Sequence, residues 1–433
     1  MRGSAVFRTG VAPGGALAGP WVQNELWTRA RAVPSLDLRF ADNKSLVDAT
    51  TGAQLDTFTR ASSGTFVGSD GLLMTAATNE PRFDHNPTTG ESLGLLVEES
   101  RTNYATQSET FTGWAPNQVT LSSASASAPN GASTVYQIIE DTSTSTHRIF
   151  VSPTTGQTVQ SHSLFVKLAS GTRRVYLSSD DTTGARQSIT FNLQTGTLVA
   201  AGASWSNVFI TPYPNGWYRI GGTITDNGGS TIFMCGLDNG SVSSYAGDGT
   251  SGIYIWGAQL EAGAFPTSYI PTTTAAATRA ADVASITGTN FSSWYSQSEG
   301  TVFASSSSYG ASNTNRRIAF ATDGTISNRF GLLYNNVNTP QMVVASAGTV
   351  VASQSAVLTG ANYSIAAAYK LDDYAISAAG SSPSTDTAGA LPVGINQLGI
   401  GNQLNGEHIN GTIRRLTYWP VRLGNTVLQQ ITQ

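Results

Sequence analysis

The sequence predicts an all-β, multidomain protein with an N-terminal arm, a small β-rich connector and two antiparallel β-sandwiches. Only 12% of the 433 residues are charged, about half the usual share. The chain holds 50 Ser, 54 Thr and 45 Gly, which suit strands and tight turns better than long helices. Short runs of alternating apolar residues recur between turn residues, which is the pattern of antiparallel strands.

The composition excludes several classes of protein. A formal net charge of −4 is not the basic footprint of a nucleic-acid binder, so no nucleic-acid partner is expected. No run of 18 apolar residues occurs, so we expect no membrane insertion by a helix. A hydrophobic content of 39% with 8 Trp, 15 Tyr and 16 Phe can build cores, which argues against disorder. The lone Cys235 rules out an intramolecular disulfide framework.

Residues 1–35 are expected to form an N-terminal docking arm. Arg2 and Arg8 precede an apolar stretch at residues 11–20, but Gly and Pro interrupt it, so we expect no cleaved signal peptide. A terminus rich in Gly, Pro and Ala frays unless something holds it. We therefore expect the arm to dock on a neighbouring subunit or a partner protein, and packing on its own chain is the alternative.

Residues 36–103 are expected to form the small β-rich connector. Leu36 to Phe40 alternate with period two, as a half-buried strand does. Residues 58–66 read as two short strands around Ser63 and Gly64, and residues 93–97 read as an apolar strand. Turn signals separate these runs.

Residues 104–271 are expected to form the first sandwich. Gly196 is placed for the left-handed position of a hairpin loop. The regular spacing without helical periods indicates an antiparallel sandwich, and the span suits a jelly roll. The expected strands are residues 163–168, 174–178, 189–193, 198–200, 217–220, 231–237 and 252–256.

Residues 271–278 read as a low-complexity linker, and residues 279–433 are expected to form the second sandwich. Asn425 can cap a short terminal helix over residues 426–431. The expected strands are residues 301–304, 317–320, 329–334, 342–344, 363–365, 374–376 and 413–419.

Several phrases of this chain resemble bacteriophage tail-fibre and head-fibre proteins. The first group resembles a connecting segment of those proteins and comprises Thr59-Arg-Ala-Ser62, Pro81-Arg-Phe-Asp-His85 and Gly94-Leu-Leu-Val-Glu-Glu-Ser-Arg-Thr-Asn103. The second group is similar to their carbohydrate-binding-module-like jelly roll and comprises Ser108-Glu-Thr-Phe-Thr-Gly-Trp114, Tyr254-Ile-Trp-Gly-Ala-Gln-Leu-Glu261 and Pro266-Thr-Ser-Tyr-Ile-Pro-Thr272. The phrase Gly411-Thr-Ile-Arg-Arg-Leu-Thr-Tyr-Trp-Pro420 resembles the last strand of a concanavalin/laminin-G-like domain.

The resemblance implies a virion protein made in the host cytoplasm and located on the tail or the capsid surface. It implies that residues 1–35 contact other virion proteins and that the chain is a homo-oligomer, as trimeric fibres are. It also implies contact with a host-surface polysaccharide. It does not distinguish a tail position from a head position, and residues 1–35 match no phrase of the family.

Catalytic motifs are absent from the sequence. The chain contains no G-x-S-x-G, H-E-x-x-H or G-K-[ST], so we expect no enzyme, no catalytic residue and no cofactor. The four histidines have no metal-ligand spacing; they are His85, His147, His162 and His408. Three aspartates in Gly-rich loops could ligate Ca²⁺, which leaves the metal question open; they are Asp226, Asp238 and Asp248.

Three pairs of adjacent carboxylates are the nearest approach to glycosidase chemistry, which needs two carboxyl groups across a cleft. Glu98 and Glu99 end an apolar strand and are expected to point to opposite faces, where they would pair with Arg82 or Arg101. The other two pairs have turn compositions and are expected in solvated loops; they are Asp180-Asp181 and Asp372-Asp373.

Aromatic side chains are better candidates for recognition, because an exposed ring stacks on the apolar face of a sugar. The candidates are Trp205, Tyr213, Trp217, Tyr245, Trp294, Tyr309 and Tyr334. The alternative is that these rings fill cores, as Trp256 is expected to do. None is singled out, so the ligand-binding residues are left unassigned. Cys235 lies in a strand-like run and is expected to be a buried, inert thiol.

Three functions follow from these observations. The leading hypothesis is a non-enzymatic virion adhesin, anchored by its N-terminus, whose sandwiches contact host-surface glycan with avidity from many copies. The second is a purely structural decoration, adaptor or baseplate protein without a ligand. The third is a polysaccharide depolymerase, which would require a carboxylate pair in a cleft.

Overall fold

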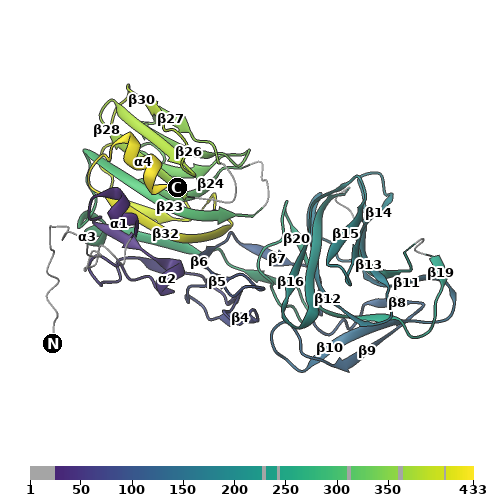
Figure 1. Ribbon diagram of the computed structural model, residues 1–433. Coiled ribbons are helices and arrows are strands. Elements are labelled where there is room, and N and C mark those ends of the chain that lie inside the picture. The colour runs from purple at the N-terminus through teal and green to yellow at the C-terminus, as the bar shows by residue number, and fades with distance from the viewer. Residues whose placement is uncertain (1–24, 227–230, 241–243, 310–313, 359–363, 404–405) are drawn as a thin grey trace, which may run out of the picture. The chain divides into compact units, whose positions relative to one another are not determined.

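The structure is a computed structural model that describes residues 25–226, 231–240, 244–309, 314–358, 364–403 and 406–433. The chain divides into two compact units. The central unit comprises residues 58–282 and 309–312, and the C-terminal unit comprises residues 1–57, 283–308 and 313–433. Antiparallel sheets build both units (Figure 1), which confirms the expected all-β class with several sandwiches. No helix in the described ranges is long and apolar enough to cross a bilayer.

The C-terminal unit is a sandwich of two antiparallel sheets (Figure 1). The first sheet runs in the order β30 (Ser384–Asp386), β29 (Asp373–Ala378), β28 (Ser364–Lys370), β23 (Glu299–Ser308) and β32 (Gly411–Trp419), with β1 (Leu36–Leu38) also paired to β32. The second runs in the order β22 (Val283–Thr287), β31 (Gln397–Ile400), β24 (Arg316–Thr322), β25 (Arg329–Tyr334), β26 (Pro340–Ser346) and β27 (Thr349–Ser355). The helices are α1 (Glu25–Ala30), α2 (Phe40–Asn43), α3 (Gly288–Ser292) and α4 (Asn425–Ile431).

The described part of the expected docking arm packs on its own chain. Leu26 and Ala30 of α1 share a buried cluster with Trp419 and α4 residues, and α1 lies beside α4 in Figure 1. The Trp419 Nε1–H donates to the carbonyl of Ala32 at 3.0 Å. For residues 25–35 the structure therefore shows the alternative, packing on the same chain, because an amphipathic turn covers apolar surface of this unit, and docking on another protein stays a prediction. Residues 1–24 lie outside the described residues.

The strand expected at Leu36 to Phe40 is shorter than its alternation indicates. It ends at Leu38, and α2 begins at Phe40. Asp37, expected to face solvent, is fully buried, because Arg415 Nε and Nη2 each donate to its carboxylate at 2.8 Å. The alternation of buried and exposed residues fails here because Asp37 of β1 forms an ion pair with Arg415 of the neighbouring strand β32, and this pairing allows the carboxylate to be buried.

The terminal helix exists, but its cap differs from the expected one. Gly424 is the N-cap and makes no side-chain cap hydrogen bond, while Asn425 is the first helical residue. The Asn425 side-chain oxygen instead accepts from Arg422 Nη2 at 2.7 Å. The expected capping role is therefore wrong by one position.

The central unit contains a sandwich preceded by short antiparallel ladders. The ladders are β3 (Gly64–Val67) with β4 (Leu73–Ala76), β5 (Phe83–His85) with β6 (Ser92–Val97), and β7 (Arg101–Asn103) with β21 (Ala277–Arg279); β2 (Thr57–Thr59) precedes them. The expected connector, residues 36–103, is divided between the two units at residue 57.

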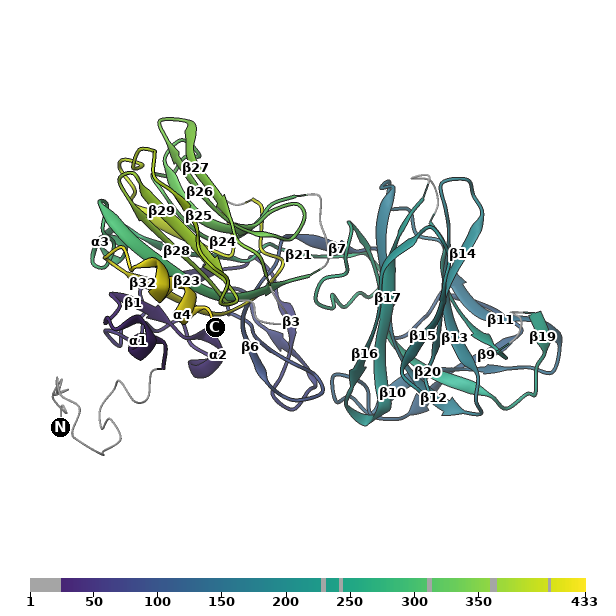
Figure 2. The same ribbon diagram turned by 45° about the horizontal axis from the view of Figure 1, so that its top comes forward.

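The two sheets of the central sandwich face each other (Figure 2). The first is β16 (Trp205–Tyr213), β17 (Trp217–Thr225), β12 (Val159–Ser170), β20 (Gly252–Ala262), β10 (Thr134–Glu140) and β9 (Val119–Ser125), with η1 (Pro214–Gly216) between β16 and β17. The second is β15 (Thr197–Ala201), β14 (Arg186–Asn192), β13 (Arg174–Asp180), β18 (Phe233–Asp238), β11 (Thr144–Val151) and β19 (Ser244–Ala246), with β8 (Ala115–Asn117) on β11. Successive strands β10 to β13 alternate between the sheets, as in a jelly roll.

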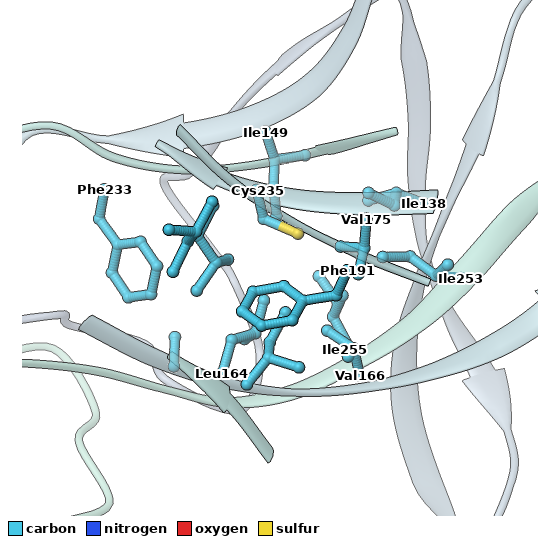
Figure 3. Close-up of a cluster of buried hydrophobic side chains, with 14 of the residues drawn as sticks. Ile138, Ile149, Leu164, Val166, Val175, Phe191, Phe233, Cys235, Ile253 and Ile255 are labelled. Atoms are coloured by element: carbon cyan, nitrogen blue, oxygen red, sulfur yellow. The ribbon is translucent and has the colours of Figure 1, made fainter. Parts of the chain in front are cut away.

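Apolar side chains from both sheets form the core of this sandwich. Figure 3 shows Leu164 and Val166 of β12 opposite Val175 of β13 and Cys235 of β18. The Cys235 thiol is free and buried, as expected, and burial raises its pKa, which disfavours the reactive thiolate. Gly196 has φ +66°, as its hairpin position predicted.

Part of the segment that was read as a linker, residues 271–278, is held by hydrogen bonds and by strand pairing. Thr272 is buried, and its backbone N–H donates to Ser108 Oγ at 2.9 Å. Residues 277–279 form β21 on β7. A low-complexity sequence is therefore ordered here, because its hydroxyl and backbone groups find partners inside the central unit.

Candidate functional site

A cleft of about 470 Å³ opens in the central unit, a size typical of ligand sites. Strands β3, β5, β6, β16 and β17 and the loop at residues 265–269 contribute its lining. The aromatic lining residues are Phe66, Phe209, Tyr213, Phe265, Tyr269 and Tyr309. The polar lining residues are Thr65, Asp84, His85, Asn207, Thr211, Arg219, Thr267 and Ser268.

A β-bulge shapes the wall that β16 contributes. The register with β17 shifts between Ser206 and Phe209, and Asn207 has φ +47°. Its Nδ2 donates to the carbonyl of Ala264 at 2.7 Å, which ties the bulge to the opposite loop. A Cβ on Gly221 would lie 2.8 Å from ring carbons of Phe209, so glycine at that position gives the Phe209 ring its space.

Two rings of the cleft lining, Tyr213 and Tyr269, pack against the buried rings of Phe165 and Trp256. Phe165 meets Tyr213 edge-on with ring centroids 5.0 Å apart, and Trp256 meets Tyr269 at 4.8 Å. Gly257, with φ +64°, lets the backbone pass close to Phe165 and Tyr269. These edge-to-face and tilted contacts favour a defined orientation of the two lining rings.

The side chains of Asp84 and His85 come from β5 and enter the lining side by side. Burial raises the pKa of Asp84 to about 6, although the Val67 N–H, which donates to it at 2.7 Å, opposes the shift. His85 Nδ1 lies 3.0 Å from the Val67 carbonyl oxygen, so Nδ1 is the donor of this hydrogen bond. His85 Nε2 has no hydrogen-bond partner among the described residues.

Arg219 of β17 supplies a positive charge to the cleft. Its Nη2 donates to Ser163 Oγ at 3.0 Å and to the Thr267 carbonyl at 2.8 Å. Its guanidinium carbon lies 5.6 Å from the ring centroid of Phe165. Both hydrogen-bond acceptors are neutral, so these contacts orient the group without cancelling its charge.

A cluster of buried charges, defined by Arg60, Arg82, Arg279, Glu98 and Asp282, supports the loop at residues 265–269. Arg82 lies 2.8 Å and Arg279 lies 3.1 Å from Glu98 Oε2, while Arg60 and Arg82 both pair with Asp282. Burial opposes ionisation of Glu98, but the two arginines lower its pKa to about 2.

The charge cluster reaches the cleft through Ser268. The Ser268 N–H donates to Glu98 Oε1 at 2.8 Å and its hydroxyl donates to Glu98 Oε2 at 2.7 Å. Arg82 Nη1 donates to Ser268 Oγ at 2.7 Å. The loop that presents Thr267 and Tyr269 to the cleft is therefore fixed from behind.

The structure separates the seven aromatic candidates into two groups. Tyr213 and Tyr309 are half-buried and line the cleft. The others are buried, as the core alternative held, and so is Trp256; they are Trp205, Trp217, Tyr245, Trp294 and Tyr334.

The carboxylate pairs take the places that the sequence predicted, except that Asp180 ends strand β13 and Asp181 is buried rather than solvated. Glu98 is buried on Arg82 and Arg279, whereas Glu99 pairs with Arg101 at 2.6 Å. Asp181 accepts from Thr183 N–H at 2.9 Å in a turn, and Asp372 also lies in a turn, with φ +54°.

The possible metal ligands do not assemble in the part of the chain that the structure describes. No group of three His, Cys, Asp or Glu side chains there could hold an ion. Asp226 accepts from Gln160, Asp248 accepts from Ser251, and Asp238 accepts from the Gly240 N–H. His147 and His162 lie in the central unit, where His147 hydrogen-bonds to backbone carbonyls and His162 packs against Trp205; His408 is buried in the C-terminal unit.

The sequence did not single out most residues of the cleft. Asp84 and His85 lie in the phrase 81–85, and Thr267 to Tyr269 lie in the phrase 266–272, which had been noted only for their family resemblance. Phe209 and Arg219 carry no motif. The adjacent Gly221 and Gly222 were the available signal in the sequence, because glycines within a strand often mark a place where other groups pack close to the backbone.

No family model matches the chain, and no curated protein matches it. A solved structure of the CBM40 of a Ruminococcus gnavus sialidase, bound to α2,3-sialyllactose, is 15% identical; the match covers 32% of this chain and 84% of the module, with TM-score 0.27. The tandem CBM22 domains of Paenibacillus barcinonensis Xyn10C are 12% identical, covering 76% and 100%, with TM-score 0.26. A Trypanosoma rangeli sialidase is 10% identical, covering 69% and 60%, with TM-score 0.27. At these scores the matches assign neither a family nor a ligand.

Proposed function

We propose that the cleft of the central unit binds a glycan. The observation that carries the proposal is the lining itself: aromatic rings, among them Tyr213, share one cleft with the polar side chains of His85 and Arg219. A sugar offers apolar C–H faces to such rings and hydroxyl groups to such donors and acceptors.

The proposed binding is not catalytic. Among the described lining residues the carboxylate is that of Asp84, whereas glycoside hydrolysis uses two carboxyl groups about 5 to 10 Å apart. Glu98 lies behind the loop and is held by two arginines. Incubation of the full chain with a bound polysaccharide should release no reducing ends, and their release would overturn the non-enzymatic part of the proposal.

The proposed setting is the bacteriophage virion. The ordered phrases between residues 59 and 420 support a fibre-type protein, and contact with other virion proteins through the N-terminal region is part of the proposal. Weak single-site binding suits this setting, because several copies on one particle raise the avidity without further contacts. Immunogold labelling of purified particles tests it, and labelling confined to the host cell would contradict it.

Binding of the full chain to a panel of bacterial surface polysaccharides tests the glycan site. The double variant Phe209→Ala/Tyr213→Ala should weaken binding about tenfold or more, since each ring contributes about 0.5 to 1.5 kcal/mol beyond its buried area. Phe150→Ala is the matched control, because Phe150 is a half-buried ring on β11, outside the cleft. Absence of binding by the parent chain would favour a purely structural role, and equal binding by the double variant would place the site elsewhere.

A further inference from the structure

The arginines of the central unit differ in how their charge is balanced. The three of the buried charge cluster lie against Glu98 and Asp282. Arg219 forms no ion pair with a carboxylate among the described residues, and its Nε is buried and without a hydrogen-bond partner. Asp84 lines the same cleft but forms no ion pair with it.

We infer that the glycan held in this cleft is anionic, and that Arg219 binds its negative group, a carboxylate or a phosphodiester. This inference rests on the proposed function, because it names the chemical class of ligand for the same cleft. A partly buried cation is costly unless it is paired, and the cleft leaves space for an anion to pair with it.

The geometry of Arg219 favours an anion over a neutral hydroxyl. Its Nη2 is engaged by Ser163 and Thr267, which leaves Nη1 for a ligand. The Phe165 ring holds the guanidinium plane in place, so little side-chain entropy is lost when a ligand binds. Hydrogen bonds between a guanidinium and an anion are roughly twice as strong as neutral ones.

The adjacent Tyr213 adds a surface for the sugar ring that bears the anion. Its ring packs edge-on against Phe165, the same ring that Arg219 overlies. A pyranose stacked on Tyr213 would therefore lie beside the cation. This juxtaposition predicts that the charge and the aromatic surface act on one residue of the glycan.

The test uses the full chain and each polysaccharide of the panel in three forms: native, carboxyl-reduced and dephosphorylated. Removal of the anion that the site recognises should weaken binding about tenfold to a hundredfold, as expected for a hydrogen bond to a charged group. Arg219→Gln should lose a similar factor for the native form, and Arg219→Lys should keep part of it. Binding should also weaken as salt is raised.

Arg186→Gln is the matched control, because Arg186 is a part-exposed arginine on β14, outside the cleft. The chemical treatment of the polysaccharide needs no variant, so a variant that fails to fold leaves the test intact. Binding that is unchanged after both treatments, or unchanged in a folded Arg219→Gln chain, would overturn the inference and leave glycan binding standing. Absence of binding to every native polysaccharide would overturn the proposed function itself.

Discussion

The central unit contains two sets of arginines, and they differ in what neutralises them. In the buried charge cluster, Glu98 and Asp282 are shared among three arginines, all nearly inaccessible to solvent. In the cleft, Arg219 faces neutral oxygens and an aromatic ring. The cluster charges are paired within the chain, whereas the charge that we propose binds a ligand is oriented and left uncancelled.

The two sets meet at one loop. Ser268 is bound by Glu98 and Arg82, while the neighbouring Thr267 carbonyl accepts from Arg219. The scaffold thus fixes the backbone that positions the cleft arginine. This link predicts that mutations in the two sets have different effects. A mutation in the charge cluster should lower the stability of the unit, whereas a mutation of Arg219 should weaken ligand binding.

The largest effect is expected from Asp282→Asn. It leaves Arg60 and Arg82 without one of their anions in a fully buried site, which costs about 3 to 5 kcal/mol of unfolding free energy. Urea denaturation followed by tryptophan fluorescence measures it. Glu99→Gln is the control, because the part-exposed pair of Glu99 with Arg101 is worth about 1 kcal/mol or less. Similar losses for the two variants would contradict the distinction.

Acid should weaken the cluster through Glu98. Its pKa is about 2 in the folded chain against an ordinary 4.5, so its contribution is complete above pH 4.5 and is lost as pH falls towards 2. A shift of this size corresponds to about 3 kcal/mol. The urea midpoint of the central unit, measured from pH 6 to pH 2.5, should fall, and the fall should be smaller in Glu98→Gln. An identical acid profile in both chains would refute this.

Asp84 in the cleft should show the opposite dependence. Its pKa of about 6 lies above the ordinary 3.8, so the folded state binds the proton more tightly and stability falls as pH rises from 4 to 6. Asp84→Asn keeps an acceptor for the Val67 N–H and should gain on the order of 2 kcal/mol at pH 7, with no gain at pH 3.5. A loss of stability at pH 7 would show that the carboxylate is compensated.

The smallest change in stability is expected from Arg219→Gln. The variant gives up two hydrogen bonds to neutral acceptors and also removes an uncancelled charge, so the unfolding free energy should change by about 1 kcal/mol or less. Thermal unfolding by circular dichroism measures this. A loss as large as that of Asp282→Asn would place Arg219 with the scaffold.

Much of the fold could be predicted because its strands carry local alternation. The runs at 163–168, 174–178 and 329–334 all lie in strands, and Glu98 and Glu99 diverge as period two requires. The strands β9, β10 and β11 were not predicted; β9 is rich in Ser and has no buried residue, so its pattern does not differ from that of a loop. The helix α1 was not predicted because its apolar residues are buried by tertiary contacts with Trp419 and α4, which the local sequence does not show.

The cleft could not be predicted because its parts are distant in sequence. Phe66, Asp84, Arg219 and Tyr269 come from four separate segments, and only the folded chain brings them together. The bulge at Asn207 has no turn signature in the sequence. That aromatic rings recognise a ligand stays a prediction, and which rings line a cleft depends on tertiary packing that composition does not encode.

Hydrogen–deuterium exchange of the full chain, with and without a polysaccharide from the panel that binds it, tests the central claim most directly. The account predicts slower exchange in residues 207–213 and 265–269, which contribute to the cleft, and no change in β15 of the same unit. Protection confined to the C-terminal unit, or none in these two segments at saturating polysaccharide, would contradict a glycan site in this cleft.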